Sequence, residues 1–317
     1  MDVTSKESFN GFMIEKFMKF IIERSNKDGS IKEEKIPNYK KYIILKEDLS
    51  NSKLYFIKEK DKMYSKKLIY QLHGGSYLTP HTNMYFKNAL RYLKACDDII
   101  VASLDYRIAP KNYFPSALED AVEGWKYLLR QGYKKEDIIV VGDSAGGNLA
   151  LALIMYLRDN FKESPAGLIL MSPWADLTDS GDSRIYNLHK DPMFGYSKYL
   201  KKVMAPSKEY VSFENLKNKL VSPVYGEFND FPPMLIQVGT HEILESDALT
   251  VYEKALKKKI DAKLSRYHNM FHGFQFVGSI LPEYKLAWHE VKEFINKIFN
   301  FSFIKSAYSL LSTKNSK

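Results

Sequence analysis

The feature that most constrains this chain is a buried strand, a glycine-bounded turn and an apolar helix in direct succession. Ile138–Val141 is a run of four β-branched apolar residues, which is typical of a strand covered on both faces. Asn148–Leu157 is apolar nearly all round, so we expect a buried helix there. Between them lies Gly-Asp-Ser-Ala-Gly, centred on Ser144. This is the context of a nucleophile elbow, in which a strained turn projects a serine hydroxyl above the sheet edge.

The glycines on either side of Ser144 support that interpretation. A side chain at Gly142 or Gly146 would clash across the tight bend. The helix that follows presents its N-terminus, which favours developing negative charge. The five-residue pattern alone also occurs in ordinary loops, so the interpretation depends on the strand and helix that flank it.

Strands and helices alternate along most of the chain, which predicts an α/β fold with a mostly parallel central sheet and helices on both faces. Active sites in such sheets lie at the carboxyl ends of the strands. The expected strands are Tyr42–Leu45, Lys53–Ile57, Leu68–Leu72, Ile99–Leu104, Ile138–Val141, Gly167–Met171, Met234–Val238 and Ala262–Tyr267. The expected helices are Met84–Cys96, Ser116–Gln131, Asn148–Leu157, Ser246–Lys259 and Glu283–Phe299.

The predicted organisation is an N-terminal cap segment, residues 1–40, then an α/β domain, residues 41–300, and a tail, residues 301–317. An insertion at about 177–225 interrupts the alternation and is expected over the pocket mouth, with helices at Ser197–Met204 and Glu209–Lys217. Residues 6–24 carry Phe and Met at helical spacing. That helix has three interpretations: packing onto the body, a mobile lid, or association with a membrane surface.

Composition excludes several classes of protein. The 317 residues are 45% apolar, which is ordinary for a globular protein. The net charge of +9 comes from scattered Lys without a nucleic-acid motif, so no nucleic-acid partner is expected. Cys96 is the only cysteine and is expected to be a buried structural thiol, which fits a reducing compartment. Lacking a signal-peptide pattern or a run of about 18 apolar residues, the chain is predicted to be cytoplasmic without membrane insertion.

A second glycine-rich turn follows the expected strand Leu68–Leu72. Gly74 and Gly75 allow backbone N–H groups to face a ligand, as an oxyanion hole requires. Each such donor stabilises the tetrahedral intermediate by about 3 kcal/mol. His73 precedes the glycines and is expected to hold the loop by side-chain hydrogen bonds rather than to act as a base.

A serine nucleophile needs a histidine base, and the chain has seven histidines. In this class of fold the base lies on the loop after the last strand, which offers His268 and His272. We favour His272 because its neighbours are apolar and Gly273 lets the chain turn beside the serine. The two histidines have the spacing of a metal pair, but Gly273 opposes the helix that such a pair needs, so no metal site is expected. The remaining histidines outside these loops, His81, His189 and His289, are expected to be solvated.

The acid that orients the base should lie after the strand Met234–Val238. Glu242 is nearest to the strand end and is the preferred residue. Asp247 is expected to start or cap the next helix and is the alternative. Glu245 is expected to be solvated.

These motifs together resemble the hormone-sensitive-lipase-like branch of the α/β-hydrolases, the carboxylesterases of bacterial family IV. The resemblance covers roughly residues 68–275. It implies an α/β-hydrolase fold with a helical cap, short- to medium-chain acyl esters as substrates and no cofactor. It implies Ser144 as nucleophile, His272 as base, and an oxyanion hole from Gly74, Gly75, Ser76 and Ala145. The matching segments are His73-Gly74-Gly75-Ser76, Asp105-Tyr106-Arg107-Ile108-Ala109-Pro110, Gly142-Asp143-Ser144-Ala145-Gly146-Gly147, Ser172-Pro173-Trp174 and His272-Gly273-Phe274.

Two positions depart from the family pattern. Ser76 stands where the family usually has a third glycine, which narrows the acyl side but keeps the backbone donor. Glu242 stands where the acid is commonly Asp. Two alternatives to an esterase share the fold: an amidase or arylformamidase using the same triad, and a non-catalytic ligand receptor like the plant gibberellin receptors, which lack the catalytic His. The sequence leaves the oligomeric state open, a homodimer included.

Overall fold

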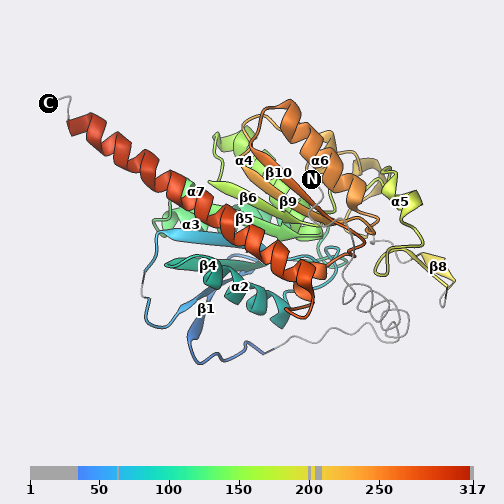
Figure 1. Ribbon diagram of the computed structural model, residues 1–317, viewed down its shortest axis with the longest axis horizontal. Coiled ribbons are helices and arrows are strands. Elements are labelled where there is room, and N and C mark those ends of the chain that lie inside the picture. Colours follow the sequence, from blue (N-terminus) through green and yellow to red (C-terminus); the bar gives the residue numbers. More distant parts are fainter. Residues whose placement is uncertain (1–34, 63, 199–200, 204–208, 315–317) are drawn as a thin grey trace.

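A computed structural model describes residues 35–62, 64–198, 201–203 and 209–314 of the chain. Its centre is an eight-stranded sheet in the order β1-β2-β4-β3-β5-β6-β9-β10 (Figure 1). The pairs β1–β2 and β2–β4 are antiparallel, and the pairs from β4 onward to β10 are parallel. All eight predicted strands are therefore present. They are β1 (Tyr42–Asp48), β2 (Lys53–Glu59), β3 (Lys67–Leu72), β4 (Ile99–Asp105), β5 (Ile138–Asp143), β6 (Gly167–Met171), β9 (Met234–Gly239) and β10 (Ala262–Tyr267).

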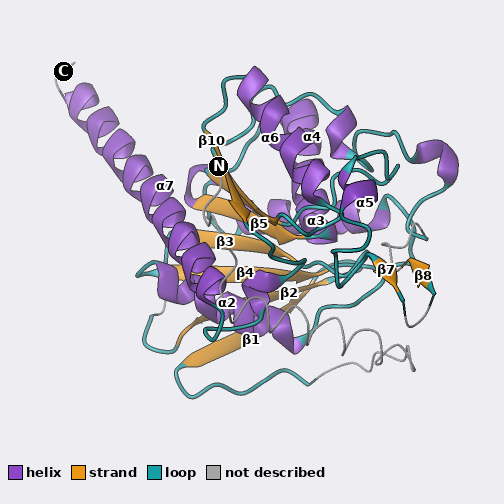
Figure 2. Cartoon of the chain, turned by 45° about the vertical axis from the view of Figure 1, so that its right-hand side comes forward, coloured by secondary structure: helices purple, strands orange, loops and turns teal. Residues whose placement is uncertain are grey.

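Helices cover both faces of this sheet, as predicted (Figure 2). The alternation of side chains along β5 shows why. Val140 joins an apolar cluster with α3, α4 and α6, whereas Ile139 and Val141 join a second cluster with α2 and α7. Both faces are thus buried, which explains the unbroken apolar run. The helices are α2 (Asn83–Ala95), α3 (Ser116–Arg130), α4 (Ala145–Phe161), α6 (Glu245–Lys257) and α7 (Pro282–Lys314), and short 3₁₀ turns occur at η1 (Lys135–Asp137) and η4 (Phe274–Phe276).

The C-terminal helix differs most in length from its prediction. It was expected over Glu283–Phe299, but α7 continues to Lys314 and so includes most of the segment predicted as a tail. Its first half packs on the sheet through residues such as Val291 and Ile295, and its second half projects beyond the body (Figure 1). The predicted helix at residues 6–24 and most of the N-terminal cap segment lie outside the described residues.

The predicted helices in the insertion are wrong. Tyr196–Ser197 (β7) pairs with Lys202–Val203 (β8) where Ser197–Met204 was expected to be helical. Glu209–Lys217 contains only the 3₁₀ turn η2 (Phe213–Asn215). Helices as short as the two predicted here are marginal without a continuous apolar face. Single side chains of this segment instead pack against the body of the protein. Tyr210, for example, stacks on Tyr77 with ring centroids 3.8 Å apart. The other regular elements are α5 (Ser183–Tyr186) and η3 (Pro223–Tyr225).

Two sequence expectations about the environment of the chain can be compared with the fold. Cys96 is buried at the end of α2, as expected for a structural thiol. None of the helices in the described ranges combines the length and the apolar character needed to cross a bilayer.

Candidate active site

The elbow serine lies between the end of β5 and the start of α4. Ser144 has φ 51° and ψ −120°, a conformation that side-chain-bearing residues avoid and that tertiary contacts must hold. Its N–H donates to the Met171 carbonyl (3.0 Å), and its own carbonyl accepts from Trp174 N–H (3.0 Å). The turn is thereby fastened to the end of β6. The side chain is nearly buried, with 4% of the residue exposed.

The flanking glycines are required by contact, as the sequence predicts. A Cβ on Gly142 would overlap the carbonyl of Gly146, and a Cβ on Gly146 would overlap the carbonyl of Leu72 at the end of β3. Neither neighbour can move easily, because both are backbone atoms. The bend is therefore closed on itself at backbone distance, and it packs as closely against the end of β3.

The structure brings together the predicted acid and base. His272 Nδ1 lies 3.0 Å from Glu242 Oε2. The other carboxylate oxygen, Oε1, accepts from the Ser172 hydroxyl (2.7 Å) and from Gly239 N–H (2.6 Å). The Glu242 side chain is fully buried and that of His272 is 10% exposed. Both oxygens of the acid are thus engaged, and a carboxylate held in this way fixes the ring orientation of the histidine.

Charge around His272 counteracts its burial. Burial lowers the pKa of His272, but the hydrogen bond and charge of Glu242, with the charges of Asp191 and Asp143, more than offset this and raise the pKa above its usual value. The Phe194 ring packs 4.7 Å from the imidazole and helps to exclude water. For Glu242 burial acts in the other direction and raises the pKa, because it disfavours the charged carboxylate. The hydrogen bond and charge of His272 lower this pKa but offset only part of the rise.

The loop after β3 presents backbone donors in the predicted place. Gly75, Ser76 and Tyr77 have φ of 110°, 56° and 61°, so the backbone turns through left-handed conformations. Within the described part of the chain, no acceptor binds the N–H groups of Gly75, Ser76 or Ala145. Ala145 is the first residue of α4, where N–H groups lack intrahelical partners.

Gly74 does not fit its predicted role as an oxyanion donor. Its N–H donates to Tyr85 Oη (2.9 Å) and Asp143 Oδ1 (3.2 Å) and so is already used. Tyr85 in turn donates to Asp143 Oδ2 (3.2 Å). Burial raises the pKa of Asp143 to about 6 despite these bonds. The Gly74 N–H therefore connects the loop to the elbow. The sequence analysis did not identify Asp143 and Tyr85 as partners of this loop, although Asp143 lies inside the elbow motif.

The histidine that precedes this loop is structural, as predicted. His73 is fully buried, stacks on Tyr106 with centroids 4.0 Å apart, and its Nδ1 lies 2.8 Å from the Gly74 carbonyl. Burial lowers the pKa of His73 to about 4, so the ring is neutral. The prediction that His81 is solvated is wrong, because its Nε2 is 2.8 Å from the hydroxyl of Ser103, and burial holds its pKa well below the usual value.

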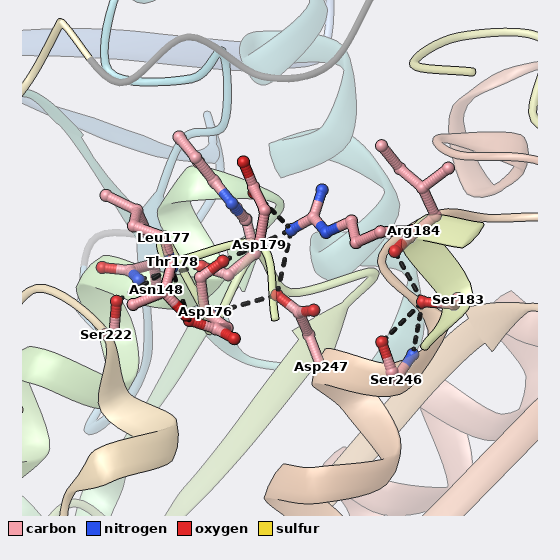
Figure 3. A network of polar contacts seen from close by, with 12 residues as sticks. Asn148, Asp176, Leu177, Thr178, Asp179, Ser183, Arg184, Ser222, Ser246 and Asp247 are labelled. Atoms are coloured by element: carbon pink, nitrogen blue, oxygen red, sulfur yellow. Dashed lines mark hydrogen bonds and ion pairs between the residues drawn. The ribbon is translucent and has the colours of Figure 1, made fainter. Parts of the chain in front are cut away.

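The alternative acid is engaged elsewhere. Asp247 Oδ2 accepts from Asp176 N–H (2.9 Å) and lies 3.6 Å from Arg184, as Figure 3 shows. Glu245, expected to be solvated, is buried and pairs with Arg266 (2.7 Å). Only Glu242 of the three acids contacts His272 in the interactions of the described residues. In the same part of the chain, no cluster of three His, Cys, Asp or Glu side chains is arranged to bind a metal.

An elbow serine, a buried acid–base pair and free N–H groups at the carboxyl ends of parallel strands define a hydrolase of the α/β class. A profile of the alpha/beta hydrolase fold matches residues 69–276. An esterase of Acinetobacter venetianus is 33% identical over 232 residues, covering 73% of this chain and 75% of the relative. An acetyl-hydrolase of Streptomyces hygroscopicus is 34% identical over 218 residues, covering 68% and 71%.

Solved structures agree. The crystal structure of an esterase from the bacterial hormone-sensitive lipase family has a TM-score of 0.78 and 27% identity, covering 92% of this chain and 99% of that one. The chain belongs to the α/β-hydrolase family, in its hormone-sensitive-lipase branch. The predicted family and the predicted class of enzyme, a carboxylic ester hydrolase, are therefore confirmed.

Proposed function

We propose that this chain cleaves short- to medium-chain acyl esters through a Ser144–His272–Glu242 triad and an acyl-enzyme intermediate. The observation that supports this most directly is the buried pair of His272 Nδ1 and Glu242 Oε2 at 3.0 Å, on the loops that follow β10 and β9. These loops and the elbow after β5 lie at the same edge of the parallel sheet (Figure 1).

The reaction follows from the roles of these atoms. Glu242 accepts the Nδ1 proton of His272 in a hydrogen bond, which leaves Nε2 free to take the proton of Ser144 as its oxygen attacks the ester carbonyl. The N–H groups of Gly75, Ser76 and Ala145 donate to the oxyanion. His272 then returns the proton to the departing alcohol oxygen, and the acyl group stays on Ser144. Water, deprotonated by His272, attacks the acyl-enzyme and releases the carboxylic acid.

The acyl specificity is proposed from the walls of this site. Ser76 adds a side chain beside the oxyanion donors, which narrows the acyl side. We propose the insertion at 177–225 as part of the cap, since its Phe194 packs on His272. A small acyl group agrees with the relative named an acetyl-hydrolase. A homodimer stays a prediction.

The experiment that tests the function compares wild type with Ser144→Ala on p-nitrophenyl acetate and butyrate. We expect kcat to fall by about 10⁴-fold or more, because the nucleophile of a triad acts as a unit with its base. Unchanged turnover in Ser144→Ala would contradict the triad mechanism. A matched anilide distinguishes the amidase, which would cleave it at a comparable rate. Tight ester binding without turnover in wild type would instead indicate a receptor.

A further inference from the structure

Side chains of the insertion hold the backbone of the acid loop on both sides of one peptide group. Asn187 Nδ2 donates to the carbonyl of Glu242 (2.8 Å). Asp191 Oδ2 accepts from the N–H of Ile243 (2.8 Å). The Glu242 carbonyl and the Ile243 N–H belong to the same peptide group. The insertion therefore binds both the acceptor and the donor of the peptide group that immediately follows the proposed acid.

Neighbouring bonds extend this contact along the loop. Asn187 Nδ2 also donates to the carbonyl of Thr240 (2.9 Å), two residues earlier. The Ser183 hydroxyl donates to the carbonyl of Ile243 (2.6 Å) and accepts from Ser246 N–H (3.0 Å). Figure 3 shows Ser183 and Ser246 joined beside the start of α6. Backbone groups between residue 240 and residue 246 are therefore paired with side chains from outside the loop.

Asp191 connects the same loop to the base. Its other oxygen, Oδ1, accepts from Met193 N–H (2.8 Å) and Phe194 N–H (3.0 Å). This turn carries the Phe194 ring that packs on His272. The Asp191 side chain is buried, with 1% of the residue exposed. One carboxylate thus fixes both the backbone that follows the acid and the ring that covers the base.

These bonds are needed because the loop satisfies only part of its own backbone. Glu242 N–H donates to the Gly239 carbonyl and the Glu242 carbonyl accepts from Glu245 N–H (3.2 Å each), but the acceptor for Ile243 N–H is Asp191. Glu242 and Ile243 are buried between β9 and α6, so a backbone group without a protein partner there has no water to bind. Asn187 and Asp191 are spaced four residues apart and linked by a hydrogen bond from Asp191 N–H to the Asn187 carbonyl (2.9 Å). The pair therefore approaches the loop as one unit.

We propose that Asn187 and Asp191 are positioning residues, through which the insertion sets the placement of Glu242 against His272. The inference rests on the proposed triad and adds a second task for the insertion, beyond covering the site. A misplacement of about 1 Å at a reacting group can cost on the order of 100-fold in rate, so this positioning is expected to act on kcat.

Two substitutions separate positioning from general packing. Asp191→Asn keeps the shape but offers one acceptor oxygen where the carboxylate uses two, so either Ile243 or the Phe194 turn loses its acceptor. Asn187→Ser shortens the side chain and leaves the carbonyls of Thr240 and Glu242 without this donor. We expect kcat to fall about 10- to 100-fold in each, with KM changed less than about threefold. Glu214→Gln, on the exposed part of the insertion, is the control and should leave both constants unchanged.

The pH profile gives a readout that a merely structural role would not move. The charged groups facing His272 are Glu242, Asp191 and Asp143, and each raises its pKa. Asp191→Asn removes one negative charge, so the acidic limb of kcat/KM should shift to lower pH whether or not Asp191 positions Glu242. Asn187→Ser removes no charge, so a shift in the same direction reports a displaced Glu242 that stabilises the imidazolium less. Glu214→Gln should not shift it.

The outcomes distinguish this inference from the triad itself. If Ser144→Ala is inactive while both positioning variants keep the kcat of wild type and Asn187→Ser also keeps its pH limb, the inference is overturned and the triad stands. An active Ser144→Ala overturns the triad. If one variant does not fold, the other variant and hydrogen exchange of the wild-type chain decide. In wild type the Ile243 amide should exchange slowly, because its N–H is bonded to Asp191. Exchange at the rate of an open loop would contradict that bond.

Discussion

Glu242 is one methylene longer than the aspartate common at this position in its family, and both of its carboxylate oxygens have partners. Its Oε1 is held by Ser172 and Gly239, and its Oε2 faces His272. Ser172 itself has φ 49°, a costly conformation held by the end of the sheet, since its N–H donates to the carbonyl of Gln237 (2.7 Å). The longer acid is thus matched by donors that fix where its carboxylate lies.

At this scale we expect Glu242→Gln to lower kcat by about 10³- to 10⁴-fold. An amide can turn its NH₂ toward Nδ1 and select the wrong tautomer of the histidine, as seen for the aspartate of serine proteases. Steady-state kinetics on a short p-nitrophenyl ester measure the effect. Asp247→Asn is the matched control, because Asp247 binds Asp176 and Arg184, and should cost less than about tenfold. A larger loss of kcat in Asp247→Asn than in Glu242→Gln would show that Asp247 is the acid of the triad.

Among the elements, α4 has the largest part in assembling the site. It starts at the elbow and buries Asn148, whose side chain bonds Tyr77 Oη (2.7 Å) and the carbonyls of Trp174 and Val221 (2.8 Å each). These partners lie on the loop after β3, after β6 and in the insertion. One polar residue of a helix that the sequence marks as apolar therefore joins three segments around Ser144.

The close packing of the elbow predicts how a substitution at the start of α4 changes stability. Gly146→Ala places a Cβ against the Leu72 carbonyl, so α4 and β3 must separate. We expect a loss of about 3 kcal/mol or more in the free energy of unfolding, measured by urea denaturation. Gly132→Ala is the comparison, because Gly132 has φ 91° but open space around its Cβ position. It should cost only about 1 kcal/mol, from backbone conformation alone. Equal losses would show that the close approach is not what requires glycine.

For the whole molecule, buried carboxyls make stability depend on pH. Burial raises the pKa of Asp247 to about 7 and that of Asp143 to about 6, against a usual value of 3.8. At these two carboxyls the folded state therefore binds more protons than the unfolded chain between about pH 4 and pH 7, so their contribution to stability falls as the pH rises through this window. His73, whose pKa burial lowers to about 4, contributes in the opposite sense.

We expect Asp247→Asn to flatten that dependence. Asp247 alone accounts for up to roughly 4 kcal/mol of lost stability between about pH 4 and pH 8. Urea denaturation of wild type and variant at several pH values measures the two slopes, and the variant should gain relative stability toward the alkaline end. Parallel curves would contradict the raised pKa. Asn keeps an acceptor for Asp176 N–H, so the comparison isolates the charge.

Much of the fold and part of the site could be predicted, because they depend on local patterns. Ile138–Val141 must be a doubly covered strand, and the glycines around Ser144 require a tight turn at its end. His272 stands out by its apolar neighbours and Gly273. Each of these signals lies within a few residues of the feature that it predicts.

Other features depend on partners far along the chain, so they follow from the tertiary structure. The Gly74 N–H is used by Tyr85 and Asp143 because α2 and the elbow lie beside the loop. Glu242 rather than Asp247 pairs with His272 because of where β9 ends and α6 begins. The insertion lacks its predicted helices because its backbone and side chains bind the body of the protein instead of each other. Periodicity in the sequence reports which face is buried, whereas the partner of a buried polar group depends on which segments the sheet order brings together.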